Sequence, residues 1–128
     1  MLSRKPACSS SNMESGLQRR IQKALRKEFR GAFVRKIHVG QYQSAGIPDL
    51  LVVVEGYAFL LEVKPDGEFP SRIQLKVMRE ARNAGACSCV VRSPDDAIDV
   101  VRYVIDARGV LQRSVRAWIM FYLRRYRG

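Results

Sequence analysis

Residues 46–64, with the sequence GIPDLLVVVEGYAFLLEVK, place two short apolar segments on either side of a turn. Residues 49–54 are almost continuously apolar, which is typical of a strand that is covered on both faces. Residues 57–64 form a second segment of strand length. Between them, Glu55-Gly56 predicts a tight two-residue turn, so we expect the two segments to pair as an antiparallel hairpin.

The predicted hairpin brings three ionisable side chains together. If Val54 lies opposite Tyr57, then Asp49 lies opposite Glu62, and directly opposed residues share a face with Cβ atoms about 5 Å apart. Lys64 shares that face with Glu62 because alternate residues of a strand point the same way. The prediction depends on the turn, since a register shift of one residue would separate the two carboxylates.

Two carboxylates beside an amine favour phosphodiester hydrolysis. Carboxylates this close repel each other, and a divalent cation removes the conflict. Carboxylate oxygens are ligands that Mg²⁺ or Mn²⁺ prefers, and such an ion can polarise a phosphoryl oxygen and lower the pKa of a water molecule. Lys64 could orient that water or stabilise charge on the phosphate. The alternative is an ordinary strand end with a Glu–Lys ion pair.

The rest of the chain predicts an α/β sandwich, in which helices cover both faces of a mixed sheet. We expect one domain over residues 13–107, a flexible lead-in over 1–12 and a basic amphipathic helix over 108–128. Apolar and turn residues set the element boundaries. The expected elements, in order, are a helix over 13–30, a strand over 32–39, the hairpin strands over 49–54 and 57–64, a helix over 71–84, a strand over 86–92, a helix from Ser93 to about Ala107 and a helix over 111–126.

The chain is strongly basic, with 23 Lys and Arg residues against 12 Asp and Glu residues and a formal net charge of +11. Residues 1–36 carry +8 and residues 107–128 carry +6, whereas residues 37–106 carry −3. This balance indicates a polyanionic partner, nucleic acid first and an anionic membrane surface second. An acidic centre between basic ends suits a protein that binds phosphates and holds a cation; a merely soluble basic protein is the alternative.

The three cysteines, at positions 8, 87 and 89, do not predict a disulfide framework, because their number is odd and their spacing irregular. Zinc binding would need more ligands than Cys87, Cys89 and the single histidine provide, so we interpret this pair as buried small apolar side chains. Residues 1–13 lack the apolar core of a signal peptide, and no apolar run reaches the roughly 20 residues of a membrane span. We expect an intracellular, cytoplasmic protein that is not secreted and has no membrane partner.

The residues around the hairpin resemble the PD-(D/E)xK nuclease signature. Pro48-Asp49, followed after twelve residues by Glu62-Val63-Lys64, matches its core pattern. The wider context, over roughly residues 13–100, is similar to the VRR-NUC branch of stand-alone phage or bacterial type. The additional matches are Glu14 in the first helix, Gly46-Ile47-Pro48-Asp49-Leu50 and Gln74 in the next helix.

This resemblance implies a restriction-endonuclease-like α/β core, α-β-β-β-α-β, with a mixed central sheet and extra C-terminal helices, so that 13–107 would be a VRR-NUC nuclease domain. It implies a Mg²⁺- or Mn²⁺-dependent hydrolase of DNA phosphodiesters. Asp49 and Glu62 would bind the metal with the Val63 carbonyl, and Glu14 would join them directly or through water. Lys64 would act on the nucleophilic water, and Gln74 would support the site. Similarity to archaeal Holliday-junction resolvases implies a homodimer acting on branched DNA.

Several of these residues also have a structural interpretation. Glu14 lies three residues after Ser11, and Gln74 three after Ser71, so each could close a helix capping box instead. The family resemblance favours the site role, more for Gln74 than for Glu14. Asp95 and Asp96 follow Ser93-Pro94 and are interpreted as helix-capping and dipole partners.

The nucleic-acid contacts are predicted from charge and position. On the first helix and in the loop before Asp49, the candidates are Arg19, Arg20, Lys23, Lys27, Gln41 and Gln43. A solvated helix face and a plain connecting loop are the alternatives. The principal hypothesis is a metal-dependent DNA endonuclease, with structure-specific cleavage as one option. The competing hypotheses are a non-catalytic basic nucleic-acid-binding module and a membrane-surface or interaction protein that uses residues 111–126.

Overall fold

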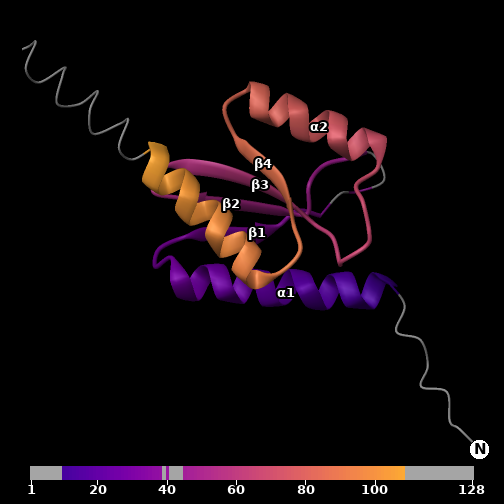
Figure 1. The fold of residues 1–128 in the computed structure, drawn as a ribbon, viewed down its shortest axis with the longest axis horizontal. Helices are drawn as coiled ribbons and strands as arrows, with labels where there is room; N and C mark the ends of the chain where they lie inside the picture. Colours follow the sequence, from indigo (N-terminus) through magenta and orange to yellow (C-terminus); the bar gives the residue numbers. More distant parts are fainter. Residues whose placement is uncertain (1–9, 39, 41–44, 109–128) are drawn as a thin grey trace, which may run out of the picture.

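The fold was analysed in a computed structural model, which describes residues 10–38, 40 and 45–108. The elements follow the predicted order, with a further helix over residues 94–108 (Figure 1). Their bounds are α1 Ser10–Glu28, β1 Phe33–Lys36, β2 Leu50–Val54, β3 Tyr57–Val63, α2 Arg72–Asn83 and β4 Cys87–Val91. The lead-in predicted over 1–12 is wrong at its end, because α1 already begins at Ser10; residues 1–9 lie outside the described residues. The predicted helix over 111–126 lies outside them altogether.

The four strands form one mixed sheet in the order β1-β2-β3-β4. β1 pairs antiparallel with β2, β2 antiparallel with β3, and β3 parallel with β4. The hairpin turn is the predicted one, because Glu55 and Gly56 have φ values of 51° and 83° and Val54 lies opposite Tyr57. Positive φ at both central residues defines the type I′ turn, whose twist matches that of the flanking strands.

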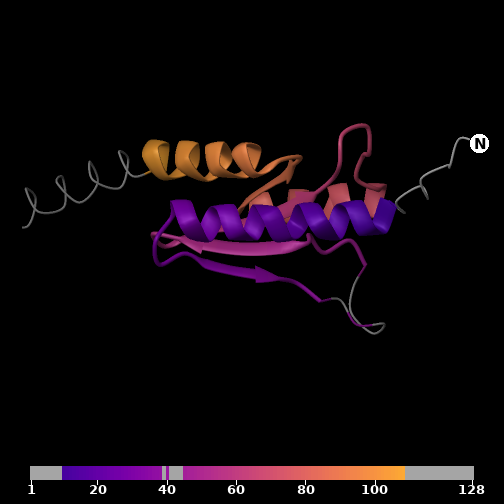
Figure 2. The same ribbon diagram turned by 90° about the horizontal axis from the view of Figure 1, so that it is seen from below.

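One face of the sheet carries the hydrophobic core. Alternate residues of β2 and β3 point to this face and are buried there: Leu50, Val52, Val54, Phe59, Leu61 and Val63. Against them pack Leu17, Ile21 and Leu25 of α1, and Ala97 and Val101 of the helix over 94–108. The fourfold spacing of the α1 residues places them on one side of the helix, as the sequence predicts. In Figure 2, α1 and the orange helix over 94–108 are seen beside the strands.

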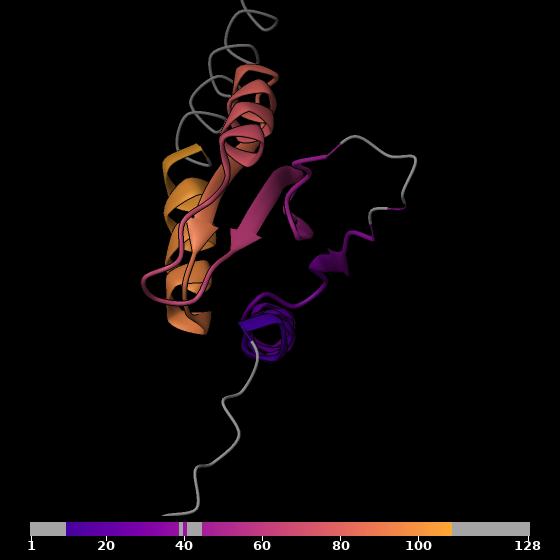
Figure 3. The ribbon, with the colours of Figure 1, turned by 90° about the vertical axis from the view of Figure 1, so that its right-hand side faces the viewer.

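On the opposite face of the sheet, α2 packs against β4 and reaches β3. Met78 is buried here and lies outside the main core cluster, while Gln74 contacts Glu62 of β3. Figure 3 looks at one end of the sheet, with α1 seen along its axis on one side of the strands and α2 on the other. Helices therefore lie on both faces of the mixed sheet, as predicted for an α/β sandwich, although Phe33 of β1 and Ala58 of β3 stay exposed on the α2 side.

The helix over 94–108 begins with the expected cap. The Asp96 N–H donates to Ser93 Oγ over 3.0 Å, and Asp96 Oδ2 accepts from the Arg92 N–H, also over 3.0 Å. The first bond satisfies a backbone donor that the first turn of a helix leaves unpaired, and the second holds the chain that leads into the helix. The capping interpretation of Asp96 is confirmed.

Candidate active site

The predicted carboxylate pair lies at the end of the central hairpin. Leu50 lies opposite Leu61, so the next pair outward is Asp49, directly before β2, and Glu62 in β3. Lys64 directly follows β3. The register that the turn predicts is therefore confirmed, and it places both carboxylates on the α2 side of the sheet, opposite the core. In Figure 1 this is the end where β3 leads into the loop before α2, near the N-terminal end of α1.

Glu62 is fully buried, although it is ionisable. Its Oε1 accepts a hydrogen bond of 2.6 Å from Gln74 Nε2, and Lys64 Nζ lies 3.6 Å from the same oxygen. Within the described part of the chain, Glu62 Oε2 has no hydrogen-bond partner. Burial, and then the charge of Asp49, raise the pKa of Glu62 from its ordinary 4.5 to about 7. Two acids this close favour a proton or a cation between them.

Asp49 is held across the hairpin by the backbone of the neighbouring strand. Its Oδ2 accepts a hydrogen bond of 2.8 Å from the N–H of Val63. The family resemblance implies a role for the Val63 carbonyl as a metal ligand; the structure shows the N–H of this residue in use, and the carbonyl role stays a prediction. The hydrogen bond turns the Asp49 carboxylate towards β3 and so towards Glu62.

Gly46 brings the segment before Asp49 against α2. Its φ is 88°, and a Cβ at this position would lie 2.8 Å from the carbonyl oxygen of Ile73 in the first turn of α2. Only glycine fits both the backbone conformation and the close approach. Pro48, two residues further along, is buried. The Gly-Ile-Pro-Asp sequence thus fixes the position of Asp49 relative to α2.

Lys64 lies between Glu62 and a third acid. Its Nζ is 4.0 Å from Oε2 of Glu14, which projects from the first turns of α1. Only 14% of the Lys64 side chain is exposed, and burial raises the pKa of Glu14. The alternative role of Glu14, closing a capping box with Ser11, is wrong because α1 begins at Ser10 and Ser11 lies inside the helix.

Gln74 performs both roles that the sequence left open. Its N–H donates to Ser71 Oγ over 3.3 Å, and its Oε1 accepts from the Ser71 N–H over 2.8 Å, which completes a capping box. Its Nε2 then donates to Glu62. One side-chain amide therefore caps α2 with its oxygen and holds the buried carboxylate with its nitrogen. Because the cap engages the oxygen, only the nitrogen can face Glu62.

The site residues fit a divalent cation that keeps several water ligands. Among the residues that the structure describes, no group of three His, Cys, Asp or Glu side chains is arranged to hold a metal ion. Asp49 and Glu62 remain as an adjacent carboxylate pair, and Glu14 lies beside Lys64. Mg²⁺ is commonly bound through one or two carboxylates and water. Such an ion would give a partner to the buried Oε2 of Glu62, which has none among the described residues, and would lower the raised pKa of this residue.

The predicted nucleic-acid contacts on α1 are solvent-accessible. All four basic residues are exposed: Arg19, Arg20, Lys23 and Lys27. Three of them recur every four positions, so they form one stripe along the helix. Gln41 and Gln43 lie outside the described residues. Cys87 and Cys89 are half-buried, have free thiols and pack against the core, which agrees with their interpretation as small apolar side chains.

Two polar residues near the site were not predicted from the sequence. Gln18, one turn after Glu14, is 4% exposed, and its Oε1 has no hydrogen-bond partner among the described residues. Arg92, directly after β4, donates from Nη1 to the carbonyls of Pro65 and Glu68. The sequence could have revealed neither, because Gln18 looks like part of a polar helix face and Arg92 is 24 to 27 positions from its partners.

Comparison with known proteins adds an independent observation. A scan against protein-family models and a search of curated proteins find no match. Among solved structures, a chain described as "VRR_NUC domain" is 31% identical, with a TM-score of 0.54, over 66% of this chain and 94% of the other. A second, described as "VRR_NUC domain protein", is 21% identical, with a TM-score of 0.59, over 73% of this chain and 88% of the other. The second supports the fold alone.

A membrane-spanning helix is not among the described elements, since none of the helices within residues 10–38 and 45–108 is both long and apolar enough.

Proposed function

Since the chain belongs to the VRR-NUC domain family and carries a nuclease-type domain, we propose that it is a metal-dependent endonuclease that hydrolyses phosphodiester bonds in DNA. The observation that carries the proposal is the convergence of Asp49, Glu62 and Lys64 at one end of the hairpin. The basic stripe on α1 supports a polyanionic substrate. Branched DNA and a homodimer are the further parts of the proposal.

Asp49 and Glu62 would hold the metal, Mg²⁺ or Mn²⁺, with Glu14 contributing directly or through water. When bound, the metal supplies a Lewis acid for the scissile phosphate and lowers the pKa of an attacking water. The Val63 N–H keeps the Asp49 carboxylate turned towards Glu62. Gln74 fixes the rotation of the Glu62 carboxylate, so that its unpartnered oxygen is available. A positioned ligand set of this kind loses no free energy to reorganisation during the reaction.

Lys64 would act on the reacting phosphate and water. Its ammonium lies between Glu14 and Glu62, with Nζ at 4.0 and 3.6 Å from their carboxylate oxygens. Both distances are longer than a direct hydrogen bond, so the ammonium is positioned by the two acids and can still contact the substrate. A lysine with little solvent exposure can orient the water or stabilise negative charge that develops on phosphate oxygens. Lys64→Met should therefore lower the cleavage rate more than it lowers DNA affinity.

The decisive experiment is cleavage of linear, flapped and four-way DNA in Mg²⁺, Mn²⁺ or chelator. Asp49→Ala should abolish cleavage and leave DNA binding nearly intact, because the side chain binds the metal and not the duplex. Asp99→Asn, an exposed acid on the helix over 94–108, is the matched control and should cleave normally. Equal activity of Asp49→Ala and the wild type would end the assignment.

A non-catalytic nucleic-acid-binding module predicts a different outcome. Such a protein would bind DNA with strong salt dependence and cleave none of the substrates in any divalent cation. Sedimentation analysis of the full chain, free and with each DNA, would test the proposed homodimer. RNA of the same sequence, offered in parallel, would test the proposed preference for DNA.

A further inference from the structure

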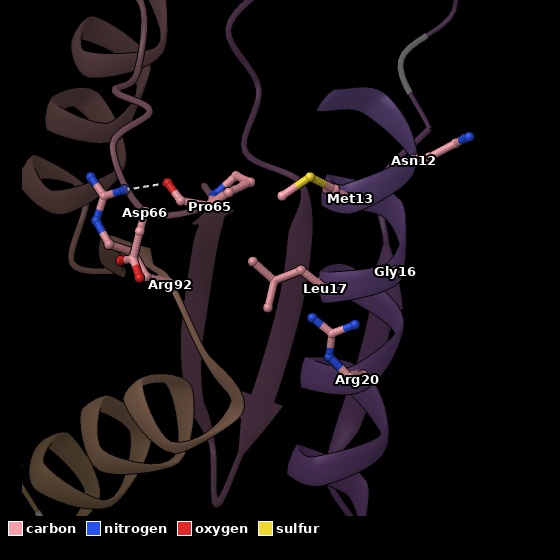
Figure 4. A pocket seen from close by; sticks show the side chains of 8 residues that line it. All are labelled: Asn12, Met13, Gly16, Leu17, Arg20, Pro65, Asp66 and Arg92. Atoms are coloured by element: carbon pink, nitrogen blue, oxygen red, sulfur yellow. Dashed lines mark hydrogen bonds between the residues drawn. The ribbon is translucent and has the colours of Figure 1, made fainter. Parts of the chain in front are cut away.

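A pocket of about 400 Å³ opens beside the site, between α1 and the loop that follows β3 (Figure 4). This volume is in the range of pockets that hold small ligands. Its walls adjoin the site residues along the chain, because Met13 directly precedes Glu14 and Pro65 directly follows Lys64. On both walls the pocket therefore lies one residue along the chain from the site.

The lining combines apolar surfaces with both signs of charge. The apolar part is formed by Met13, Leu17 and Pro65, whose side chains point into the gap in Figure 4. The charged part is formed by Arg20, Arg92 and Asp66. A bare phosphate would meet the Asp66 carboxylate, and a hydrocarbon would desolvate the charges without pairing them. A nucleobase fits better, since its faces are apolar and its edge carries both hydrogen-bond donors and acceptors.

The loop that forms one wall is held in place before any ligand binds. Arg92 Nη1 donates to the carbonyl oxygens of Pro65 and Glu68 over 2.7 and 2.8 Å. The same guanidinium lies 5.4 Å from the ring centre of Phe69, which is 79% exposed. An exposed aromatic ring beside a residue that lines the pocket offers a stacking surface for a neighbouring base. Arg92 therefore connects the pocket wall to this surface.

On the α1 side, Gly16 leaves the pocket open. Within the part of the chain that the structure describes, a Cβ added at this position would meet Arg20 Nη1 alone, at 3.5 Å, which is ordinary contact. Glycine in a helix interior costs about 0.5–1 kcal/mol relative to alanine. A larger side chain at Gly16 would occupy the space between α1 and Pro65.

We infer that this pocket receives one unpaired base of the DNA, next to the phosphate that the site cleaves. The inference rests on the proposed nuclease function and specifies its substrate. A base stacked in an intact duplex cannot enter a pocket, and an unpaired base enters without the cost of breaking a base pair. DNA with an unpaired nucleotide near the cleavage position is therefore the preferred substrate.

The test measures binding in chelator, so that cleavage does not interfere. The full chain is titrated against a duplex with a single unpaired adenosine and against the same duplex with an abasic residue at that position. Removing the base should weaken binding at least about fivefold, the lower end of what loss of one stacked base costs. An unpaired 2-aminopurine should change its fluorescence on binding. Equal affinity for the two duplexes would overturn the inference.

Variants at Gly16 locate the effect in the pocket. Gly16→Phe fills the pocket, so the ratio of the affinities for the adenosine and the abasic duplex should fall close to one. Like Gly16→Phe, Gly16→Ala raises the helix propensity at this position, but it adds only one methyl group. The alanine variant should therefore keep most of the preference for adenosine over the abasic residue. If circular dichroism shows that Gly16→Phe is unfolded, the abasic comparison with the wild-type chain still decides.

Failure of this inference is distinguishable from failure of the proposed function. If no divalent cation supports cleavage, or Asp49→Ala remains active, the nuclease proposal fails whatever the binding data show. If cleavage depends on Asp49 but the abasic residue binds as well as adenosine, only the pocket inference fails.

Discussion

At its C-terminal end, strand β3 is fully buried on both faces, and the two faces differ in chemistry. On one face, Phe59, Leu61 and Val63 are fully buried against α1 and the helix over 94–108. On the other face, the Glu62 carboxylate is just as buried, beside Asp49. Apolar burial stabilises the fold at about 25 cal/mol per Å², whereas a buried carboxylate resists ionisation and opposes it. The difference indicates that apolar burial on the core face offsets the free-energy cost of burying the Glu62 carboxylate on the site face.

The largest effect should come from the core face. Leu61→Ala should lower the free energy of unfolding by about 2–5 kcal/mol, because it removes buried methyl groups and leaves a cavity. Urea denaturation monitored by circular dichroism measures this. Leu60→Ala, on the opposite face and only half-buried, is the control and should cost less. A similar loss for both variants would show that the two faces contribute alike.

Glu62→Gln should raise the free energy of unfolding, whereas Leu61→Ala lowers it. Because the pKa of Glu62 is about 7 in the folded chain and near 4.5 when unfolded, its contribution to stability is complete below pH 4.5 and is lost as the pH rises through 7. In chelator at pH 8, Glu62→Gln should therefore be more stable than the wild type by roughly 1–3 kcal/mol. At pH 5 the two should be nearly equal.

The pH dependence of stability must be compared between the wild type and Glu62→Gln, because the wild type contains other groups that titrate in this range. A hydrogen bond from Cys89 lowers the pKa of the Cys87 thiol to about 7, which adds stability as the pH rises and so partly masks the Glu62 effect. The difference in thermal midpoint between wild type and Glu62→Gln, followed from pH 5 to 8, isolates the carboxylate. A difference that does not change with pH would contradict the raised pKa.

Gln74→Glu tests the support of the site without removing the cap. A glutamate still accepts from the Ser71 N–H but cannot donate to Glu62, so two carboxylates would face each other. We expect the affinity for Mn²⁺ to fall about 10- to 100-fold, as for other residues that orient metal ligands. Isothermal titration at pH 8 measures it. Unchanged affinity would mean that Gln74 is only a helix cap.

Ser71→Ala is the complementary and smallest change. It removes the Ser71 hydroxyl that accepts from the Gln74 N–H and leaves the bond from Gln74 Nε2 to Glu62 in place. The expected cost is about 1 kcal/mol of stability, with Mn²⁺ affinity nearly retained. Loss of metal affinity equal to that of Gln74→Glu would show that the cap and the site cannot be separated.

The sequence predicted the hairpin and its register because the physics there is local. Glu55-Gly56 sets the turn, and the turn sets which residues face each other, so the Asp49–Glu62 pair followed by counting. For Gln74, local rules and the family resemblance gave two answers that competed on paper, and the side chain satisfies both. Residue spacing could not show that the Gln74 amide uses its oxygen for the helix cap and its nitrogen for Glu62.

The pocket was beyond prediction because its parts are far apart in the chain. Arg92 and Pro65 are 27 positions apart and meet only because β3 and β4 are parallel neighbours. Gly16 is an unremarkable residue within an amphipathic helix until the opposite wall is known. Likewise, the N–H of Val63 reaches Asp49 through a backbone geometry that residue types do not specify.

The contact between Gly46 and the first turn of α2 has a mechanical consequence. With the carbonyl of Ile73 only 2.8 Å from where a Cβ would stand, the loop backbone cannot slide towards the helix. A push on α2 from outside must therefore shift this loop, and Asp49 three residues further along would travel with it. Since Gln74 ties the same helix to Glu62, a displacement of α2 would reach both acids at once.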